Sequence, residues 1–175
     1  MDGSRICNAA VSLNADFAAF TRTIGVDALS FGGTKNGMMF GEAVIIFNPA
    51  LAQEFKYIRK QGMQLHSKMR FIGAQFAALL SNELWKKNAE HANRMAKLLE
   101  KELRQFKEIQ LTQSVDANAV FAIFPQKIIE PLQREIFFYV WNDRTFEVRL
   151  MCAFDTTAEE IKNFGRKIKA LLTNA

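Results

Sequence analysis

The stretch SFGGTKNG, residues 30–37, sets a single lysine in a short glycine-rich loop between two apolar runs. A phosphate-binding P-loop needs GxxxxGK followed by Ser or Thr at the start of a helix, and the order GGTK does not fit that pattern. A lysine can also form a Schiff base when it is held near a carbonyl carbon in a partly desolvated site. From the loop alone, Lys35 is either such a lysine or a solvent-exposed loop residue.

Three more charged residues are candidates for chemistry. Asp2 and Arg5 belong to the stretch DGSR, where an isolated aspartate is a turn residue and an isolated arginine a surface salt-bridge residue. Arg149 lies in the apolar stretch FEVRLMCAF, where an unpaired charge is costly. A bound anion and a structural ion pair would both account for Arg149.

The remaining polar candidates are two hydroxyl residues, four basic residues, and the cysteines and histidines. The hydroxyls of Ser30 and Thr34 could lie near a cofactor phosphate or could cap the turn. Four basic residues either bring positive charge to a site of this or a neighbouring subunit or form solvated helix faces: Arg59, Lys60, Lys68 and Arg70. The two cysteines and two histidines lack the spacing of a disulfide framework or a metal site, so no metal is predicted.

Apolar patterns predict the elements that position these residues. Residues 26–31 and 43–47 are compact apolar runs bounded by turn residues, which predicts two short, mostly buried strands on either side of the lysine loop. Helices are predicted over residues 8–20, with a break near Leu13-Asn14, over 49–61, with Asn48 as cap and Pro49 in the first position, and over 65–81.

The second half of the chain predicts a different layout. A helix over residues 83–106 carries an apolar stripe that must pack against something. Short strands and helices then alternate, and Thr156-Thr157 with Glu159-Glu160 forms a capping-box pattern at the start of the last helix. We therefore predict three parts: residues 1–82, a connecting helix over 83–106, and a small α+β domain over 107–175.

Composition restricts the class of protein. Apolar residues make up 49% of the chain and charged residues 23%, as in ordinary globular domains. The net charge is +5, but the basic residues are scattered among glutamates, which argues against nucleic-acid binding. No run approaches the roughly twenty apolar residues of a membrane span, and the amino terminus has no signal pattern. These features predict a cytoplasmic protein without a nucleic-acid or membrane partner.

Four blocks in order carry a family resemblance: DGSR with NAA, then SFGGTKNG, GEAVIIF and SKMRFIGAQFAALL. Together they resemble the carboxyl-terminal half of the threonine aldolase and aromatic amino acid β-eliminating lyase family, over essentially the whole chain. The resemblance implies an α/β fold: the end of the large domain's mainly parallel sheet, as in aspartate-aminotransferase-like pyridoxal-phosphate enzymes, followed by a small α+β domain. It also implies pyridoxal 5'-phosphate as cofactor and a small amino-acid substrate.

The resemblance assigns roles residue by residue. Lys35 matches the lysine that holds the cofactor covalently, and Asp2 matches the aspartate that pairs with the pyridine nitrogen. Arg5 and Arg149 match the arginines that hold the substrate carboxylate, although Ser4 replaces the commoner alanine before Arg5. Ser30 and Thr34 are the candidates for the cofactor phosphate.

The family's preceding half, with its phosphate loop and ring-stacking histidine, cannot be placed in this sequence. We therefore expect a truncated lyase resembling low-specificity L-threonine aldolase, which cleaves a β-hydroxy-α-amino acid to glycine and an aldehyde, with little activity alone. β-Elimination and racemisation would use the same residues. The alternative is a non-catalytic fragment or assembly module that pairs with itself, as a homo-oligomer, or with a separately encoded amino-terminal half.

Overall fold

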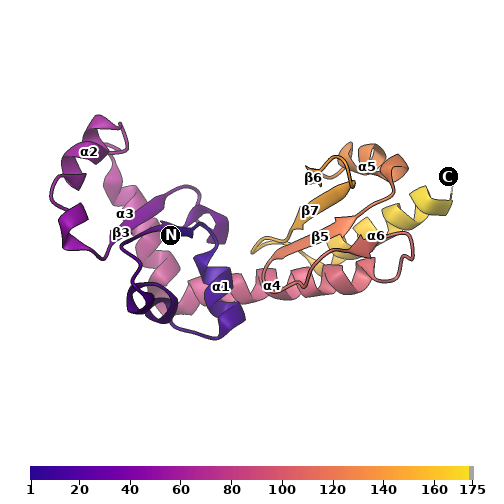
Figure 1. Cartoon of the computed structure of the whole chain (residues 1–175), viewed down its shortest axis with the longest axis horizontal. Coiled ribbons are helices and arrows are strands. Elements are labelled where there is room, and N and C mark those ends of the chain that lie inside the picture. The colour runs from indigo at the N-terminus through magenta and orange to yellow at the C-terminus, as the bar shows by residue number, and fades with distance from the viewer. Residues whose placement is uncertain (174–175) are drawn as a thin grey trace. The chain divides into compact units, whose positions relative to one another are not determined.

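The computed structural model describes residues 1–173 of the chain, and their contacts divide them into two compact units (Figure 1). Unit 1 comprises residues 1–89 and unit 2 begins at residue 90. The boundary lies inside the long helix α4, Leu84–Leu103. Among residues 1–173, no helix has both the length and the apolar character needed to cross a membrane.

Unit 1 is built around a three-stranded sheet in the order β1-β2-β3. The strands are β1 Asp2–Gly3, β2 Ala28–Gly32 and β3 Glu42–Ile46. β1 and β2 are parallel, but β3 returns antiparallel to β2 directly after the lysine loop. The sheet is therefore mixed rather than mainly parallel, and β3 is largely exposed, contrary to the buried strand predicted over 43–47.

The helices of unit 1 occur between β1 and β2 and after β3 in the chain. α1, Ile6–Leu13, ends where Asn14 takes the left-handed conformation (φ 48°), so the break predicted near Leu13-Asn14 is confirmed. Single 3₁₀ turns follow at Phe17–Phe20 and Arg22–Ile24. α2 spans Phe55–Gln61 and α3 spans Met69–Leu80. The core of the unit consists of Ile6, Cys7, Leu29, Phe31 and Ala89.

The helix predicted over residues 49–61 is divided in two. Asn48 caps a 3₁₀ turn over Pro49–Leu51 as predicted, with its side chain accepting from the Ala50 amide, and α2 starts only at Phe55. None of the residues in these two elements is buried. Short helices in water depend on packing of an apolar face, so nothing in unit 1 holds this segment as one continuous helix.

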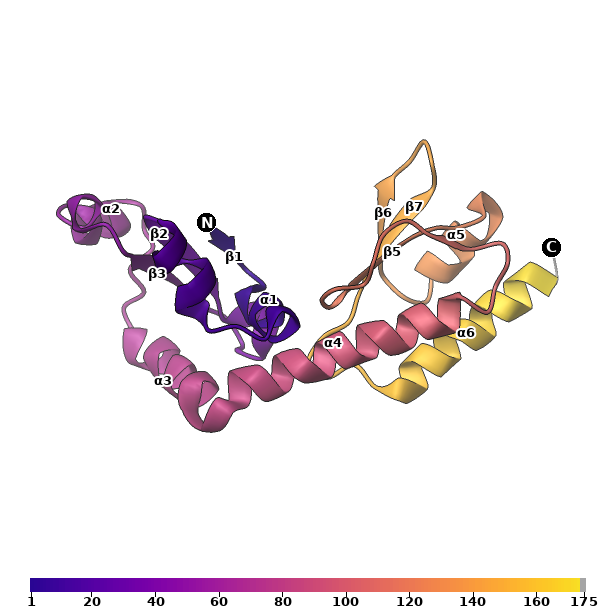
Figure 2. The same cartoon turned by 60° about the horizontal axis from the view of Figure 1, so that its bottom comes forward.

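Unit 2 packs helices against one face of an antiparallel sheet (Figure 2). The strands are β4 Gln110–Leu111, β5 Ala119–Ile123, β6 Tyr139–Asn142 and β7 Glu147–Met151, in the order β4-β5-β7-β6. α4, α5 (Gln126–Gln133) and α6 (Ala158–Thr173) share the core with them. Burial alternates along β5 and β7, as expected for a sheet with one covered face.

Two helix signals of the sequence are confirmed in this unit. The apolar stripe of α4 is buried from Ala96 to Leu103 and contributes to the core. At the start of α6, the Thr157 amide donates to Glu160 (2.7 Å) and the Glu160 amide donates to the Thr157 hydroxyl (3.2 Å), which is a capping box. The Thr157 amide and the Thr157 hydroxyl (2.9 Å) both donate to the Glu160 carboxylate, and these two bonds lower the pKa of Glu160.

The aromatic centre of this core gives a test of the packing. Phe124 is 1% exposed and its ring lies 6.3 Å from that of Phe138, whereas Phe137 is 76% exposed. We expect Phe124→Ala to lower the free energy of unfolding by about 3–5 kcal/mol, because it leaves a buried cavity. Phe137→Ala is the matched control and should cost less than about 1 kcal/mol. Urea unfolding followed by circular dichroism measures both, and equal losses would contradict this core.

Candidate functional site

The predicted site residues of unit 1 lie at one edge of its sheet. Because β1 and β2 are parallel, their carboxyl ends lie at the same edge, which is where ligands bind in parallel sheets. The first strand leads into Ser4 and Arg5, and the second leads into the turn that carries Lys35. Asp2 is paired in register with Ser30, and the charges of Lys35 and Arg5 both act on its carboxylate. The fold thus brings together five of the six predicted residues around this edge.

Asp2 is held as an ionised carboxylate. Its Oδ1 accepts hydrogen bonds from the Ser4 hydroxyl (2.6 Å) and the Ser4 amide (2.8 Å). These two bonds, followed by the positive charges of Lys35 and Arg5, lower the pKa of Asp2, although the group is exposed. A carboxylate with a lowered pKa is the kind of group that can keep a partner nitrogen protonated.

The glycines of the loop are required by the chain's own backbone. A Cβ at Gly32 would overlap the carbonyl of Ser4 and lie 2.7 Å from the Ser4 Cα, and one at Gly33 would lie 2.9 Å from the carbonyl oxygen of Gly41. The space beside both glycines is therefore filled by protein. The two glycines therefore allow segments of the protein itself to approach closely.

The two predicted hydroxyl groups stabilise turns at the same edge. Ser30 Oγ accepts from the amide of Gly3 at 3.4 Å. Thr34 Oγ1 accepts from the amide of Gly41 at 3.0 Å and donates to its carbonyl at 3.3 Å, which closes the loop over residues 34–41. Both side chains belong to exposed residues, so their hydroxyls remain accessible at the edge.

Sequence reasoning missed Asn36, the residue next to the lysine. Lys35 is exposed, but Asn36 is 3% exposed and donates from Nδ2 to the carbonyl of Trp85 at 3.0 Å. Its own carbonyl accepts from Asn88 Nδ2 at 2.8 Å. The partners lie about fifty positions away in the sequence, so no local pattern indicates these contacts.

Arg149 lies in unit 2 on the sheet face that the helices leave open. Its guanidinium carbon is 4.7 Å from the ring centre of Trp141 and 5.1 Å from that of Tyr139, in the geometry of cation–π contacts. Its Nε is buried without a hydrogen-bond partner, and no Asp or Glu among residues 1–173 forms a salt bridge with it. Within the described chain Arg149 therefore forms no structural ion pair.

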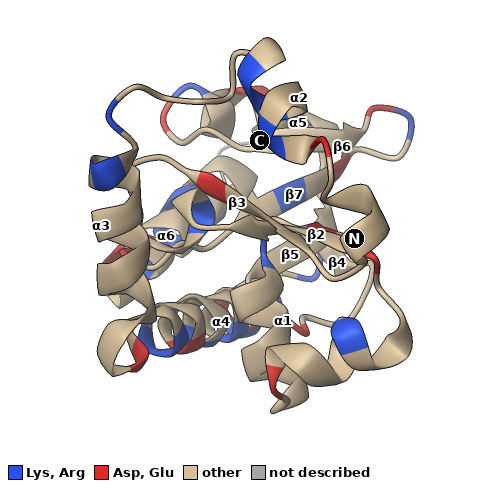
Figure 3. Ribbon diagram, turned by 90° about the vertical axis from the view of Figure 1, so that its left-hand side faces the viewer, with Lys and Arg blue, Asp and Glu red and all other residues tan. Residues whose placement is uncertain are grey.

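The basic residues predicted as either site charge or solvated surface lie on α2 and at the start of α3 (Figure 3). Lys60, Lys68 and Arg70 are exposed, whereas Arg59 has a buried Nε without a hydrogen-bond partner. In the part of the chain that the structure describes, no three His, Cys, Asp or Glu side chains are grouped to hold a metal ion.

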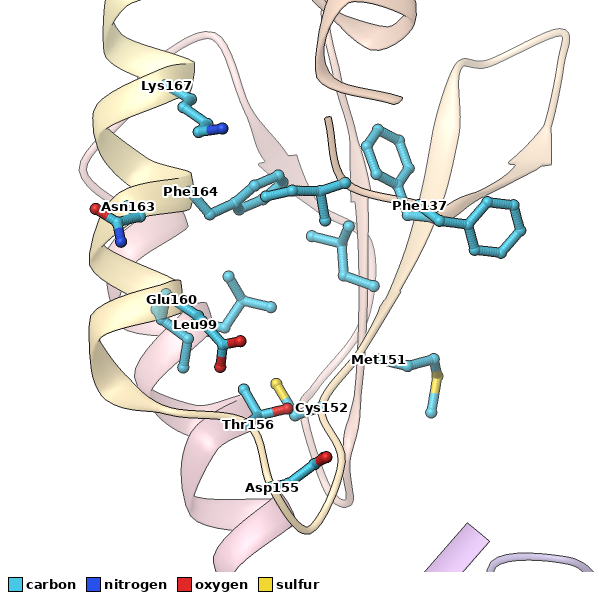
Figure 4. Close-up of a pocket in the computed structure, with 14 residues that line it drawn as sticks. Leu99, Phe137, Met151, Cys152, Asp155, Thr156, Glu160, Asn163, Phe164 and Lys167 are labelled. Carbon is cyan, nitrogen blue, oxygen red and sulfur yellow. The ribbon is translucent and has the colours of Figure 1, made fainter. Parts of the chain in front are cut away.

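A cavity of about 490 Å³ lies in unit 2, and none of these residues lines it. It is lined by apolar side chains such as Leu99 and Phe164, with Asp155, Glu160 and Lys167 on its polar side (Figure 4). Cys152 lies in its wall, where burial raises the pKa of the thiol to about 12. An unreactive thiol and an apolar lining carry no chemistry of the predicted kind.

The residues at the sheet edge of unit 1 fit pyridoxal phosphate. The group needs a lysine for its aldehyde carbon and a carboxylate for its ring nitrogen. An exposed Lys35 and an ionised Asp2 at one edge supply both, and Arg5 adds a positive charge beside them. The residue types at this edge are therefore compatible with a pyridoxal-phosphate site.

The chain belongs to the beta-eliminating lyase family, whose model matches residues 1–126. It is 39% identical over 176 residues to the low specificity L-threonine aldolase of Pseudomonas aeruginosa, covering 98% of this chain and 50% of that protein. A protein of the same name from another Pseudomonas is 38% identical over 177 residues, covering 99% and 50%. The predicted family is therefore confirmed.

A solved structure agrees with these sequence matches. The structure of Leishmania major threonine aldolase superposes with a TM-score of 0.85 at 31% identity, covering 98% of this chain and 51% of that one. The chain spans about half the length of the curated relatives it matches.

The close approach at Gly32 predicts opposite effects of one substitution at two glycines. Gly32→Ala should lower the free energy of unfolding by about 1–3 kcal/mol, because the new methyl group meets the backbone of Ser4. Gly73→Ala should raise it by about 0.5–1 kcal/mol, because Gly73 lies inside α3 with nothing within 4 Å of its Cβ position. Denaturant midpoints measure both, and a neutral Gly32→Ala would contradict the packing of this edge.

The hydrogen bonds of Asp2 predict a change in its titration. Ser4→Ala removes the hydroxyl donor, so the pKa of Asp2 should rise towards its ordinary value, as followed by carboxyl NMR. Because the folded pKa is lowered, Asp2 stabilises the fold above its unfolded pKa, and this contribution is lost as the pH falls through the folded pKa. Lys35→Gln should raise the pKa less, since the charge of Lys35 is a smaller cause than Ser4. An unchanged Asp2 titration in Ser4→Ala would contradict the arrangement.

Proposed function

We propose that the chain carries the covalent, acidic and substrate-holding residues of a pyridoxal-phosphate site that cleaves a β-hydroxy-α-amino acid such as L-threonine. In this reaction a base takes the proton of the β-hydroxyl, the Cα–Cβ bond breaks, and a proton is added to Cα. One amino acid thus yields glycine and an aldehyde. When bound, pyridoxal phosphate supplies the electron sink that accepts the electrons left by the broken bond.

Lys35 and Asp2 hold the cofactor in this proposal. Lys35 offers an amine at the carboxyl end of β2, on a single turn whose backbone is fixed on both sides. Asp2 would keep the ring nitrogen protonated, because Ser4 and the nearby cations lower the pKa of its carboxyl group. Ser30 and Thr34 present hydroxyls at the same edge, where they can add to the hold on the phosphate.

In this proposal Arg5 and Arg149 are the two candidates for binding a substrate carboxylate. A planar guanidinium matches a carboxylate with two parallel hydrogen bonds, which a lysine cannot form. The rings of Trp141 and Tyr139 keep Arg149 in a fixed orientation, so little side-chain entropy is lost when the anion binds. The missing acid partner of Arg149 within residues 1–173 supports an anionic ligand.

One observation carries the proposal: an ionised aspartate, an exposed lysine and an arginine share the carboxyl edge of two parallel strands. Membership of the beta-eliminating lyase family supports the same cofactor. The names of the relatives favour aldol cleavage among the reactions that these residues could serve. β-Elimination and racemisation use the same groups and differ in which bond is aligned with the cofactor.

A second candidate is an assembly role, either with a second copy of the chain or with a separately encoded amino-terminal half. Unit 1 exposes large apolar side chains on α2 and α3, and monomeric proteins seldom leave such surface open. The residues are more than half exposed: Tyr57 55%, Ile58 57% and Phe71 56%.

The covalent role of Lys35 can be tested on the purified chain. With one equivalent of pyridoxal phosphate followed by borohydride reduction, we expect a stable cofactor adduct on the peptide that contains Lys35, located by mass spectrometry. Lys35→Ala should abolish the adduct, because a free amine at this position is required. Aldehyde release from L-threonine then measures the cleavage itself.

The matched control is Lys101→Ala, which removes an exposed lysine of α4 in unit 2 and should leave the Lys35 adduct unchanged. A wild-type chain without an adduct at Lys35 would refute the cofactor role and favour the assembly role. An adduct without aldehyde release, but with keto-acid formation or loss of chirality in an amino acid, would favour elimination or racemisation.

A further inference from the structure

The position of the Lys35 amine depends on the backbone of a very short turn. The 3₁₀ turn Thr34–Asn36 is closed by hydrogen bonds from the amides of Asn36 (3.0 Å) and Met38 (3.2 Å) to the carbonyl of Gly33. An exposed lysine side chain is flexible and fixes nothing by itself. Whatever orders Lys35 must therefore act on the residues beside it.

Asn36 ties this turn to two other elements of unit 1. Its side chain donates to the carbonyl of Trp85 at 3.0 Å, and its carbonyl accepts from the side chain of Asn88 at 2.8 Å, so α4 contacts both its side chain and its backbone. Asn36 also forms a hydrogen bond with the thiol of Cys7 on α1. Burial outweighs this bond and raises the pKa of Cys7 to about 12, so the thiol stays protonated as a neutral partner.

A buried asparagine is a costly choice unless its polar atoms are needed. An apolar residue fills a core position at lower desolvation cost, whereas a satisfied polar network selects one arrangement of the groups it joins. Here the network joins the residue after Lys35 to the start of α4, and Asn36 itself is only 3% exposed.

We infer that Asn36 is a positioning residue for Lys35: through Trp85, Asn88 and Cys7 it fixes the turn from which the lysine amine reaches the cofactor. The inference rests on the proposed function of Lys35. In physical terms, hydrogen bonds on the buried side of the turn hold the backbone rigid, and the side chain of Lys35 on the exposed side remains free to move.

Two measurements on the full chain test this role. In Asn36→Ala, the amides of Asn36 and Met38 should exchange hydrogen about 10- to 100-fold faster, because buried hydrogen bonds are lost. At saturating pyridoxal phosphate, the rate constant of borohydride-trapped attachment to Lys35 should fall at least about tenfold, since misplacement by about 1 Å can cost about 100-fold. The half-saturating cofactor concentration should change by less than about threefold, because the groups that bind the cofactor remain.

The matched control is Asn48→Ala, which removes an asparagine of the same unit with two hydrogen bonds of its own, to Asp27 and Ala50. It lowers stability by a lost cap, typically about 1 kcal/mol, and should leave attachment to Lys35 unchanged. Asn88→Ala, which removes only the bond to the Asn36 carbonyl, should slow attachment in the same direction as Asn36→Ala. It keeps the test open if Asn36→Ala fails to fold.

The outcomes separate this inference from the proposed function. Attachment at Lys35 in the wild type, slowed in Asn36→Ala and Asn88→Ala but not in Asn48→Ala, supports both. Attachment that is equally fast in all four proteins overturns the inference and leaves the proposed function standing, as does unchanged amide exchange in Asn36→Ala. A wild-type chain that forms no adduct at Lys35 overturns the proposed function and, with it, the role of Asn36.

Discussion

The parallel pairing of β1 with β2 is the contact on which the arrangement of Asp2, Arg5 and Lys35 depends. The two strands share only two residue pairs, yet their direction decides at which edge each following loop emerges. In an antiparallel pair, Arg5 and Lys35 would follow strands that end at opposite edges. The close contact of Gly32 with the backbone of Ser4 then brings the two loops together, which is why a side chain is excluded there.

The charges of the two units are stabilised in different ways. Asp2 is exposed, and directed hydrogen bonds from Ser4 keep it ionised without burial. Arg149 is half-buried between two aromatic rings, which attract the cation but cannot accept hydrogen bonds from Nε in the plane of the guanidinium. The bonds from Ser4 keep the carboxylate of Asp2 ionised while it is exposed to water. The two aromatic rings orient the guanidinium of Arg149, but its Nε has no hydrogen-bond partner. Each charge is thus stabilised by neighbours within its own unit.

Local signals predicted what local interactions determine. The end of α1 at Asn14, the cap at Asn48 and the box at Thr157 follow from side-chain and backbone geometry within a few residues, and the structure has them all. The division of the helix over residues 49–61 and the antiparallel return of β3 follow from burial and strand pairing. Burial and strand pairing depend on residues that are distant in the sequence, and the local periodicity of apolar residues carries no information about them.

The same limit applies to the site. Lys35, Asp2 and Arg5 could be proposed as site residues because their types and their order in the chain carry a family resemblance. Asn36 could not, because its role follows from hydrogen bonds to the distant residues Trp85 and Asn88. A reactive side chain must be free to move, so its own contacts reveal little about how it is positioned. The ordering groups lie one residue along and on the buried side of the turn. The turn thus meets two requirements at adjacent positions. The exposed Lys35 leaves the amine mobile, and the buried Asn36 keeps the backbone rigid.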